Sequence, residues 1–166
     1  MEHSELIAAF VKELDAEYTS TKKCLERIPA SLYDYKPHPR STNMGYLALL
    51  VAEIPLWITY IIEKGEIDFA TYNHFEAKST EELSQHFEDN FQSAKTTLQN
   101  VTEEGLKGIF YLKNDGKELF SIPKIDNISS TLNHWVHHRG QLTVYMRLND
   151  IAVPSIYGPS ADDRNF

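Results

Sequence analysis

The chain has 166 residues, of which 42% are hydrophobic and 24% are charged, and its net charge is −8. This length fits a single domain, residues 1–166, which can bury a core without a disulfide or a structural metal. The acidic balance, with no basic stripe among the Lys and Arg residues, excludes nucleic acid as an expected partner. Because the lone Cys24 cannot form an internal disulfide and no signal peptide is visible, we expect a cytoplasmic protein.

The first half of the chain predicts two helices joined by a linker that contains three prolines. Apolar residues near helical spacing indicate a helix from about residue 4 to 27, and the linker covers residues 29–40. A second helix begins near Thr42 or Asn43 and ends around residues 64–65. Its apolar segment, residues 47–62, is interrupted by Glu53 and Pro55 and is too short to span a bilayer comfortably, so we expect a core helix and no membrane partner.

The second half predicts two more helices with a small hairpin between them. Ser79 and the residues after it form a typical helix start, and the third helix continues to about Glu104. Two short strands, residues 109–112 and 118–122, flank an Asp-Gly turn, which predicts a hairpin and not a larger sheet. The last helix begins near Pro123 or Lys124 and ends at about Leu148, and the tail, residues 149–166, is not helical throughout.

Four amphipathic helices with short links predict an all-α fold, an antiparallel four-helix bundle with a β-hairpin before the last helix. On the last helix, a polar stripe borders the apolar face and is formed by His134, His138, Gln141 and Tyr145. Sites in bundles are built between facing helices, so we expect these side chains to line a pocket. Arg139 falls within the apolar stripe and needs a carboxylate or several carbonyl partners if it is buried.

His134 and His138 are four residues apart, which places both imidazoles on one helix face, where they could hold one metal ion. Two histidines are half of a tetrahedral site, and a pair at this spacing also occurs as hydrogen-bonded polar residues at the edge of a core. His3, His38, His74 and His86 have no partner at ligand spacing, and His137 points about 100° away from His138 and is expected at the surface. The spacing therefore leaves both interpretations open.

Longer motifs around this pair resemble a known family. The segments His134–Leu142, Tyr145–Leu148 and Val153–Asp162, together with Lys36–Ser41 and Gly45–Pro55, resemble the DinB-like (DinB/YfiT-type) family of small bacterial four-helix proteins. The resemblance covers nearly the whole chain. It implies an up-down-down-up bundle, commonly a homodimer, and a divalent metal held by one histidine of the second helix and two of the last.

This chain departs from the family pattern on the second helix. The resemblance aligns Leu50 with the first metal histidine, whereas His134 and His138 match the other two. A leucine side chain offers no lone pair, so the site is degenerate unless another group replaces the ligand. Glu53, three residues further on, is the candidate third ligand or general base, and its alternative role is a salt bridge to Arg139 or Lys64.

Weaker candidates for the third ligand are His38 and Asp162 in the flanking loops.

The possible functions of the protein belong to different classes. The favoured hypothesis is a non-catalytic, dimeric module that binds a small molecule in a pocket containing Leu50, Gln141 and Tyr145. The alternative is a hydrolase or thiol transferase that uses zinc, nickel or manganese on the histidine pair, as the resemblance implies for some relatives. A purely structural dimer that pairs through the apolar second helix is the third.

Overall fold

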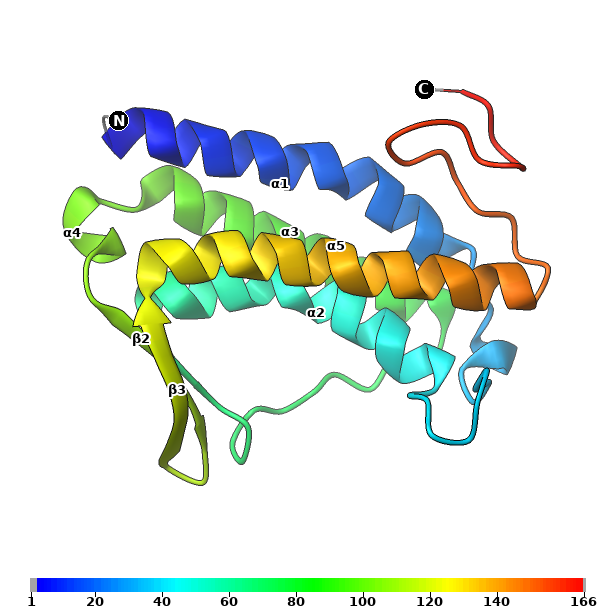
Figure 1. Ribbon diagram of the computed structural model, residues 1–166, viewed down its shortest axis with the longest axis horizontal. Coiled ribbons are helices and arrows are strands. Elements are labelled where there is room, and N and C mark those ends of the chain that lie inside the picture. The colour runs from blue at the N-terminus through cyan, green and yellow to red at the C-terminus, as the bar shows by residue number, and fades with distance from the viewer. Residues whose placement is uncertain (1–2, 166) are drawn as a thin grey trace.

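The computed structural model describes residues 3–165, so the first two residues and Phe166, the end of the predicted tail, lie outside the described residues. The described chain is mostly helical, with five α-helices and a three-stranded sheet (Figure 1). In chain order the elements are α1 (His3–Glu26), the 3-10 helix η1 (Ala30–Leu32), α2 (Met44–Glu63), β1 (Glu66–Asp68), α3 (Thr80–Asn100), α4 (Glu103–Leu106), β2 (Ile109–Asn114), β3 (Lys117–Pro123) and α5 (Lys124–Leu148).

The helix starts follow from capping side chains that the sequence supplies. Asn43 is the N-cap of α2, where its Oδ1 accepts a hydrogen bond from the backbone N–H of Tyr46 at 2.8 Å. Ser79 caps α3 in the same way, and its Oγ accepts from the N–H of Glu82 at 3.2 Å. At the other end of α2, Gly65 has a φ of +70°, a conformation that favours glycine and ends the helix.

The predicted end of the third helix at Glu104 is wrong, because α3 stops at Asn100. Val101 is extended, with φ −66° and ψ 135°. The next residue, Thr102, begins the separate short helix α4 and accepts a hydrogen bond from the N–H of Gly105 on its side-chain oxygen. A threonine that bonds to local backbone in this way competes with continuation of the preceding helix.

The four long helices lie side by side (Figure 1), and α1 and α2 each pack against both α3 and α5. By length and composition, α2 is the one described helix that could cross a membrane, but 61% of its most apolar window is buried within the fold. That burial is typical of a core helix, as the sequence predicted.

The prediction of a lone hairpin is wrong, because β1 adds a third strand in the order β1-β2-β3. β1 pairs parallel to β2, with Ile67 opposite Leu112, and β2 pairs antiparallel to β3. Asp115 and Gly116 form the predicted turn, both with positive φ. The carboxylate of Asp68, at the end of β1, accepts hydrogen bonds from both of their N–H groups and so joins the third strand to the turn.

Arg139 is buried, 1% exposed, and has the carboxylate partner that the sequence required of it. Its guanidinium bonds the carboxylate of Glu17 on α1, and it also donates to the Glu17 carbonyl and to the hydroxyl of Thr21, both at 3.1 Å. The hydroxyl of Tyr157 accepts from Arg139 at 3.0 Å and donates to Glu17 at 2.9 Å. The C-terminal tail is therefore fastened to α1 and α5 through this buried network.

Candidate functional site

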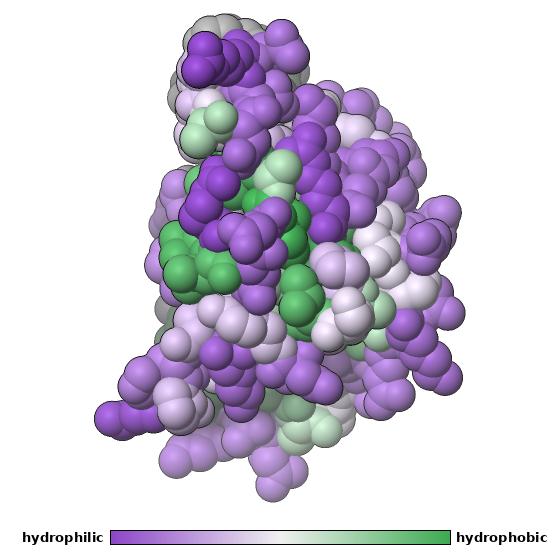
Figure 2. All heavy atoms as spheres, turned by 90° about the vertical axis from the view of Figure 1, so that its right-hand side faces the viewer, coloured by the Kyte–Doolittle hydropathy of each residue, from purple (hydrophilic) through white to green (hydrophobic). Residues whose placement is uncertain are grey.

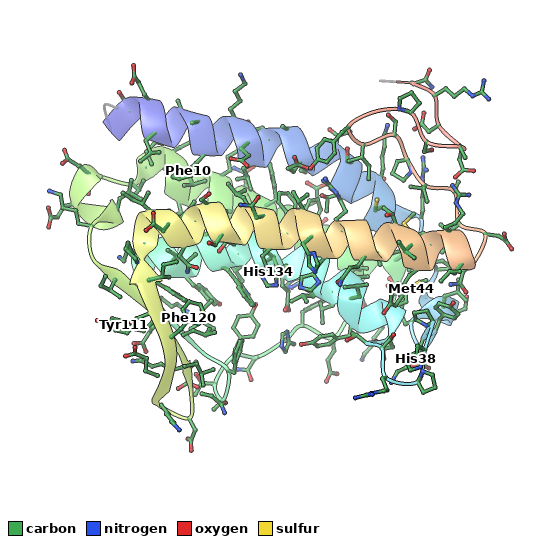
Figure 3. The ribbon with its side chains drawn as sticks, in the orientation of Figure 1. Phe10, His38, Met44, Tyr111, Phe120 and His134 are labelled. Atoms are coloured by element: carbon green, nitrogen blue, oxygen red, sulfur yellow. The ribbon has the colours of Figure 1, made fainter. Side chains whose placement is uncertain are left out.

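The two histidines of α5 meet at their ring nitrogens. Nε2 of His134 lies 2.7 Å from Nε2 of His138, and Nδ1 of His138 lies 2.7 Å from Oε1 of Gln141. Figure 3 shows His134 between α5 and α2. Spacing by one helical turn places the rings on one face, and the shared hydrogen bond fixes how they face each other.

Burial disfavours the charged form of both rings. It lowers the pKa of His134 to about 4, with smaller contributions from His138 and His137. Burial also lowers the pKa of His138. Gln141 Oε1 can only accept, so Nδ1 of His138 donates to it and Nε2 of His138 must accept from His134. In this arrangement, Nδ1 of His134 is left with a free lone pair.

The structure places Leu50, His138, Gln141 and Tyr145 in the wall of one cavity of about 490 Å³, which we call the Leu50 pocket. All four were predicted from the sequence to line a pocket, but His134, which was expected with them, lines a different cavity. Tyr145 donates a hydrogen bond to the carbonyl oxygen of Thr42 at 3.0 Å, so the loop before α2 closes this side of the cavity. Leu50 and His138 line the same cavity, so residue 50 gives the wall an apolar side chain where the family resemblance expects a histidine.

Residues 3–165 contain no group of three His, Cys, Asp or Glu side chains placed to hold a metal ion. The two nitrogens of the histidine pair are close to the separation that a shared metal ion requires. A tetrahedral ion with metal–nitrogen bonds of about 2.0–2.1 Å holds two ligand nitrogens about 3.3 Å apart, against 2.7 Å between the two Nε2 atoms. Gln141 accepts from the outer nitrogen of His138, as the partner of a ligating histidine does. The donor set thus lacks its third member and does not fit a three-ligand centre.

Glu53, the candidate third ligand, is 2% exposed and fully engaged elsewhere. Its carboxylate accepts from Nδ1 of His74 at 2.6 Å and from the N–H of Phe75 at 2.9 Å, and Nε2 of His86 lies 3.4 Å away. Burial alone would raise the pKa of Glu53, but the hydrogen bonds from His86, Phe75 and His74 outweigh it and lower the pKa. The salt bridge to Arg139 or Lys64 that served as the alternative role is also wrong.

The two loop candidates are also occupied. Nδ1 of His38 accepts a hydrogen bond from the N–H of Arg40, which is a local turn contact. Asp162 pairs with Arg147 and accepts from the N–H of Val153, so it holds the tail in place. Neither side chain bonds the histidine pair within the described part of the chain.

A feature that sequence reasoning missed is the loop between β1 and α3, which lies against α2. His74 of this loop bonds Glu53, and Tyr72 accepts a hydrogen bond from Trp57 Nε1 at 3.3 Å. The ring of Trp57 in turn lies 5.5 Å from that of His134. One signal could have pointed to this docking: a glutamate inside an apolar helix needs partners, and His74 and His86 were available.

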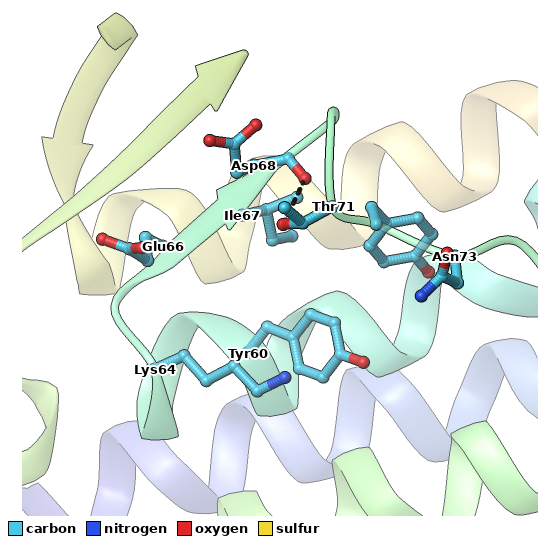
Figure 4. Close-up of a pocket in the computed structure, with 8 residues that line it drawn as sticks. Tyr60, Lys64, Glu66, Ile67, Asp68, Thr71 and Asn73 are labelled. Atoms are coloured by element: carbon cyan, nitrogen blue, oxygen red, sulfur yellow. Dashed lines mark hydrogen bonds between the residues drawn. The ribbon is translucent and has the colours of Figure 1, made fainter. Parts of the chain in front are cut away.

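A further cavity, of about 310 Å³, lies between the end of α2 and β1 (Figure 4). It contains none of the side chains predicted from the sequence. Lys64 lies 3.7 Å above the ring of Tyr60, and the carboxylate of Asp68 points away from both toward backbone N–H groups (Figure 4). Its charged groups are therefore committed to structural contacts, and we place the candidate site at the histidine pair.

Comparison with known proteins agrees with the resemblance. The family model described as the DinB family matches residues 1–165. A DinB-like protein (YjoA) from Bacillus subtilis superposes with a TM-score of 0.68 at 19% identity, covering 94% of this chain and 99% of that one. A DinB-like protein from Bacillus cereus gives a TM-score of 0.68 at 21% identity, covering 89% of this chain and 95% of that one. No curated protein matches the sequence. The chain belongs to the DinB family.

Proposed function

We propose that this DinB-family chain is a non-catalytic module that binds a small molecule in the Leu50 pocket. The observation that carries the proposal is Leu50 itself, which lies in the pocket wall beside His138 and offers no lone pair. Glu53 cannot replace the missing ligand while its carboxylate is held by His74 and Phe75. The cavity has a mixed lining of hydroxyl, amide, imidazole and apolar groups with one guanidinium, that of Arg40, which suits recognition of a small organic compound.

The proposed architecture is the up-down-down-up four-helix bundle of the family. Its support is that α1 and α5 run from left to right in Figure 1, whereas α2 and α3 run from right to left. In this arrangement α2 and α5 are neighbours, so Leu50 of α2 and His138 of α5 line the same cavity.

The alternative is a metal-dependent hydrolase or thiol transferase with zinc, nickel or manganese on His134 and His138. The convergence of the two Nε2 atoms supports it. The deciding experiment measures metal content by elemental mass spectrometry on tag-free native protein, His134→Ala and Leu50→His, after incubation with each ion. Our proposal expects metal-free native protein and about one ion per chain in Leu50→His, because a third imidazole completes the site. Near-stoichiometric metal in native protein that is lost in His134→Ala would favour the enzyme.

A matched pair of variants tests ligand binding in the Leu50 pocket. Val144 and Leu148 lie one turn apart on α5 and are each 57% exposed, but only Val144 lines the pocket. Val144→Trp should therefore abolish the thermal shifts produced by hits from a small-molecule library, whereas Leu148→Trp should keep them. Equal shifts in both variants would place ligand binding outside this pocket.

We also propose that the protein is a cytoplasmic homodimer. The exposed apolar side chains of Val144 and Leu148 support an interface near the end of α5. Figure 2 views this end of the molecule and shows apolar atoms near its centre, framed by hydrophilic side chains. Light scattering after size-exclusion chromatography should give twice the chain mass for the native protein and the single-chain mass for Leu148→Asp.

A further inference from the structure

A third cavity, of about 280 Å³, is lined by His134 and lies between α2, α5 and the sheet. We call it the Trp57 pocket. Its apolar wall includes Trp57 of α2 and Phe110 and Phe120 of the sheet. Its polar wall is one stripe of α5, formed by Asn127, Ser130, Thr131 and His134. The Leu50 pocket shares no lining residue with it.

Two polar side chains of this wall are buried without a protein partner. Asn127 is 8% exposed and Thr131 is 4% exposed, and neither side chain makes a hydrogen bond to another described residue. Buried amides and hydroxyls normally have partners, because leaving them unpaired costs free energy. Both side chains line the cavity and their polar atoms stay accessible from it, so water or a ligand in the cavity supplies their hydrogen-bond partners.

His134 contributes a hydrogen-bond acceptor, the ring nitrogen Nδ1. Its Nε2–H is committed to His138, and the outer nitrogen of His138 is committed to Gln141. Nδ1 of His134 has no donor among the described residues, so this ring can accept one hydrogen bond from a ligand. A hydroxyl group of a ligand is the simplest donor that would satisfy it.

The cavity wall contains no Asp, Glu, Lys or Arg side chain, so it offers an ionised ligand no counter-charge and favours a neutral one. The aromatic side chains of Trp57, Phe110 and Phe120 offer ring faces and edges to a flat ligand. The cavity is smaller than most drug-sized sites, which limits the ligand to one or two rings. From these contacts we infer that the Trp57 pocket binds a neutral phenol, with its ring against Trp57 and the phenylalanines and its hydroxyl on the α5 stripe.

The proposal is tested by titrating the full-length protein with 4-methylphenol and following the amide signals by NMR. The comparison ligands are 4-methylanisole, which lacks the donor hydrogen, and 4-methylbenzoate, which is charged. We expect shifts concentrated at residues 127–134 and in β2 and β3, with binding at least about tenfold weaker for both comparison ligands. Absence of 4-methylphenol binding at millimolar concentration, or equal binding of 4-methylanisole, would overturn the inference.

Neighbouring serines of α5 supply a matched pair of variants. Ser129 and Ser130 are both exposed, but only Ser130 lines the cavity. Ser130→Trp should weaken 4-methylphenol binding at least about tenfold, whereas Ser129→Trp should leave it unchanged. Retained binding in Ser130→Trp would place the phenol elsewhere. Val144→Trp, which blocks the Leu50 pocket, should leave 4-methylphenol binding intact. The proposals for the two pockets are therefore tested independently.

Discussion

Removing one member of the buried ion pair between Glu17 and Arg139 should destabilise the fold strongly. Arg139→Met deletes a guanidinium whose side chain is 2% exposed and which bonds Glu17, Thr21 and Tyr157. The carboxylate of Glu17, whose side chain is 10% exposed, would keep only the hydroxyl of Tyr157 as a partner. A buried charge that loses its counterion cannot recover the hydration it gave up on folding.

The expected loss is about 3–5 kcal/mol for Arg139→Met, the range for breaking one side of a buried pair. For a chain of this length, that loss lowers the melting temperature by roughly 6–20 °C. Glu17→Leu should cost a comparable amount, because the guanidinium is then the unpaired group. The double variant removes both charges and should cost clearly less than the sum of the two single changes.

Urea unfolding, followed by circular dichroism, measures the free energy of unfolding of the native protein, the two single variants and the double variant. An unchanged slope of this free energy against urea concentration shows that unfolding exposes the same surface area in each protein. A loss below about 1 kcal/mol in Arg139→Met, or costs that add in the double variant, would refute the assignment of Glu17 and Arg139 as a desolvated, mutually dependent pair. Tyr157→Phe is the internal control, because it removes two hydrogen bonds but no charge and should cost about 1–3 kcal/mol.

Three further predictions concern the site and the helix starts. The free energy of unfolding should fall as the pH drops from about 6.5 toward 4, because burial lowers the pKa of His134 to about 4. In this pH range the unfolded chain binds a proton at His134 that the folded chain does not bind. His134→Gln should therefore flatten this part of the curve of unfolding free energy against pH. Glu53→Gln should speed amide hydrogen exchange at Phe75 about tenfold or more, because the loop loses its charged anchor, and unchanged exchange would contradict that role. Asn43→Ala should cost about 1 kcal/mol in urea unfolding, and a loss near zero would show that the cap is dispensable.

The long helices could be predicted because their signals are local. Asn43 and Ser79 each bond a backbone N–H three residues ahead, and residue type alone identifies such caps. The Asp115-Gly116 turn is equally local, since both residues adopt the positive φ that this turn requires. Strand β1 could not be predicted in this way, because three residues carry no periodicity and Ile67 pairs with Leu112, 45 positions away.

The candidate site divides along the same line. The contact of His134 with His138 follows from helical spacing, and Gln141 lies one turn further along the same face. The fate of Glu53 depends on His74 and His86, which are 21 and 33 residues away. No spacing rule connects Glu53 with these two histidines. The sequence therefore assigned Glu53 to the histidine pair, whereas in the folded chain its carboxylate bonds the loop between β1 and α3.

The position of Glu53 also has a consequence for how Leu50 is interpreted. Glu53, a buried glutamate three residues after Leu50 on α2, would be the obvious replacement ligand if its oxygens were free, but they accept from His74 and Phe75 and so stabilise the loop instead. Recruiting Glu53 to a metal would leave His74 and the Phe75 N–H without a partner and would release the loop from α2. Recovering a three-ligand centre in this chain therefore requires a new donor at residue 50 and cannot come from rotation of Glu53 alone.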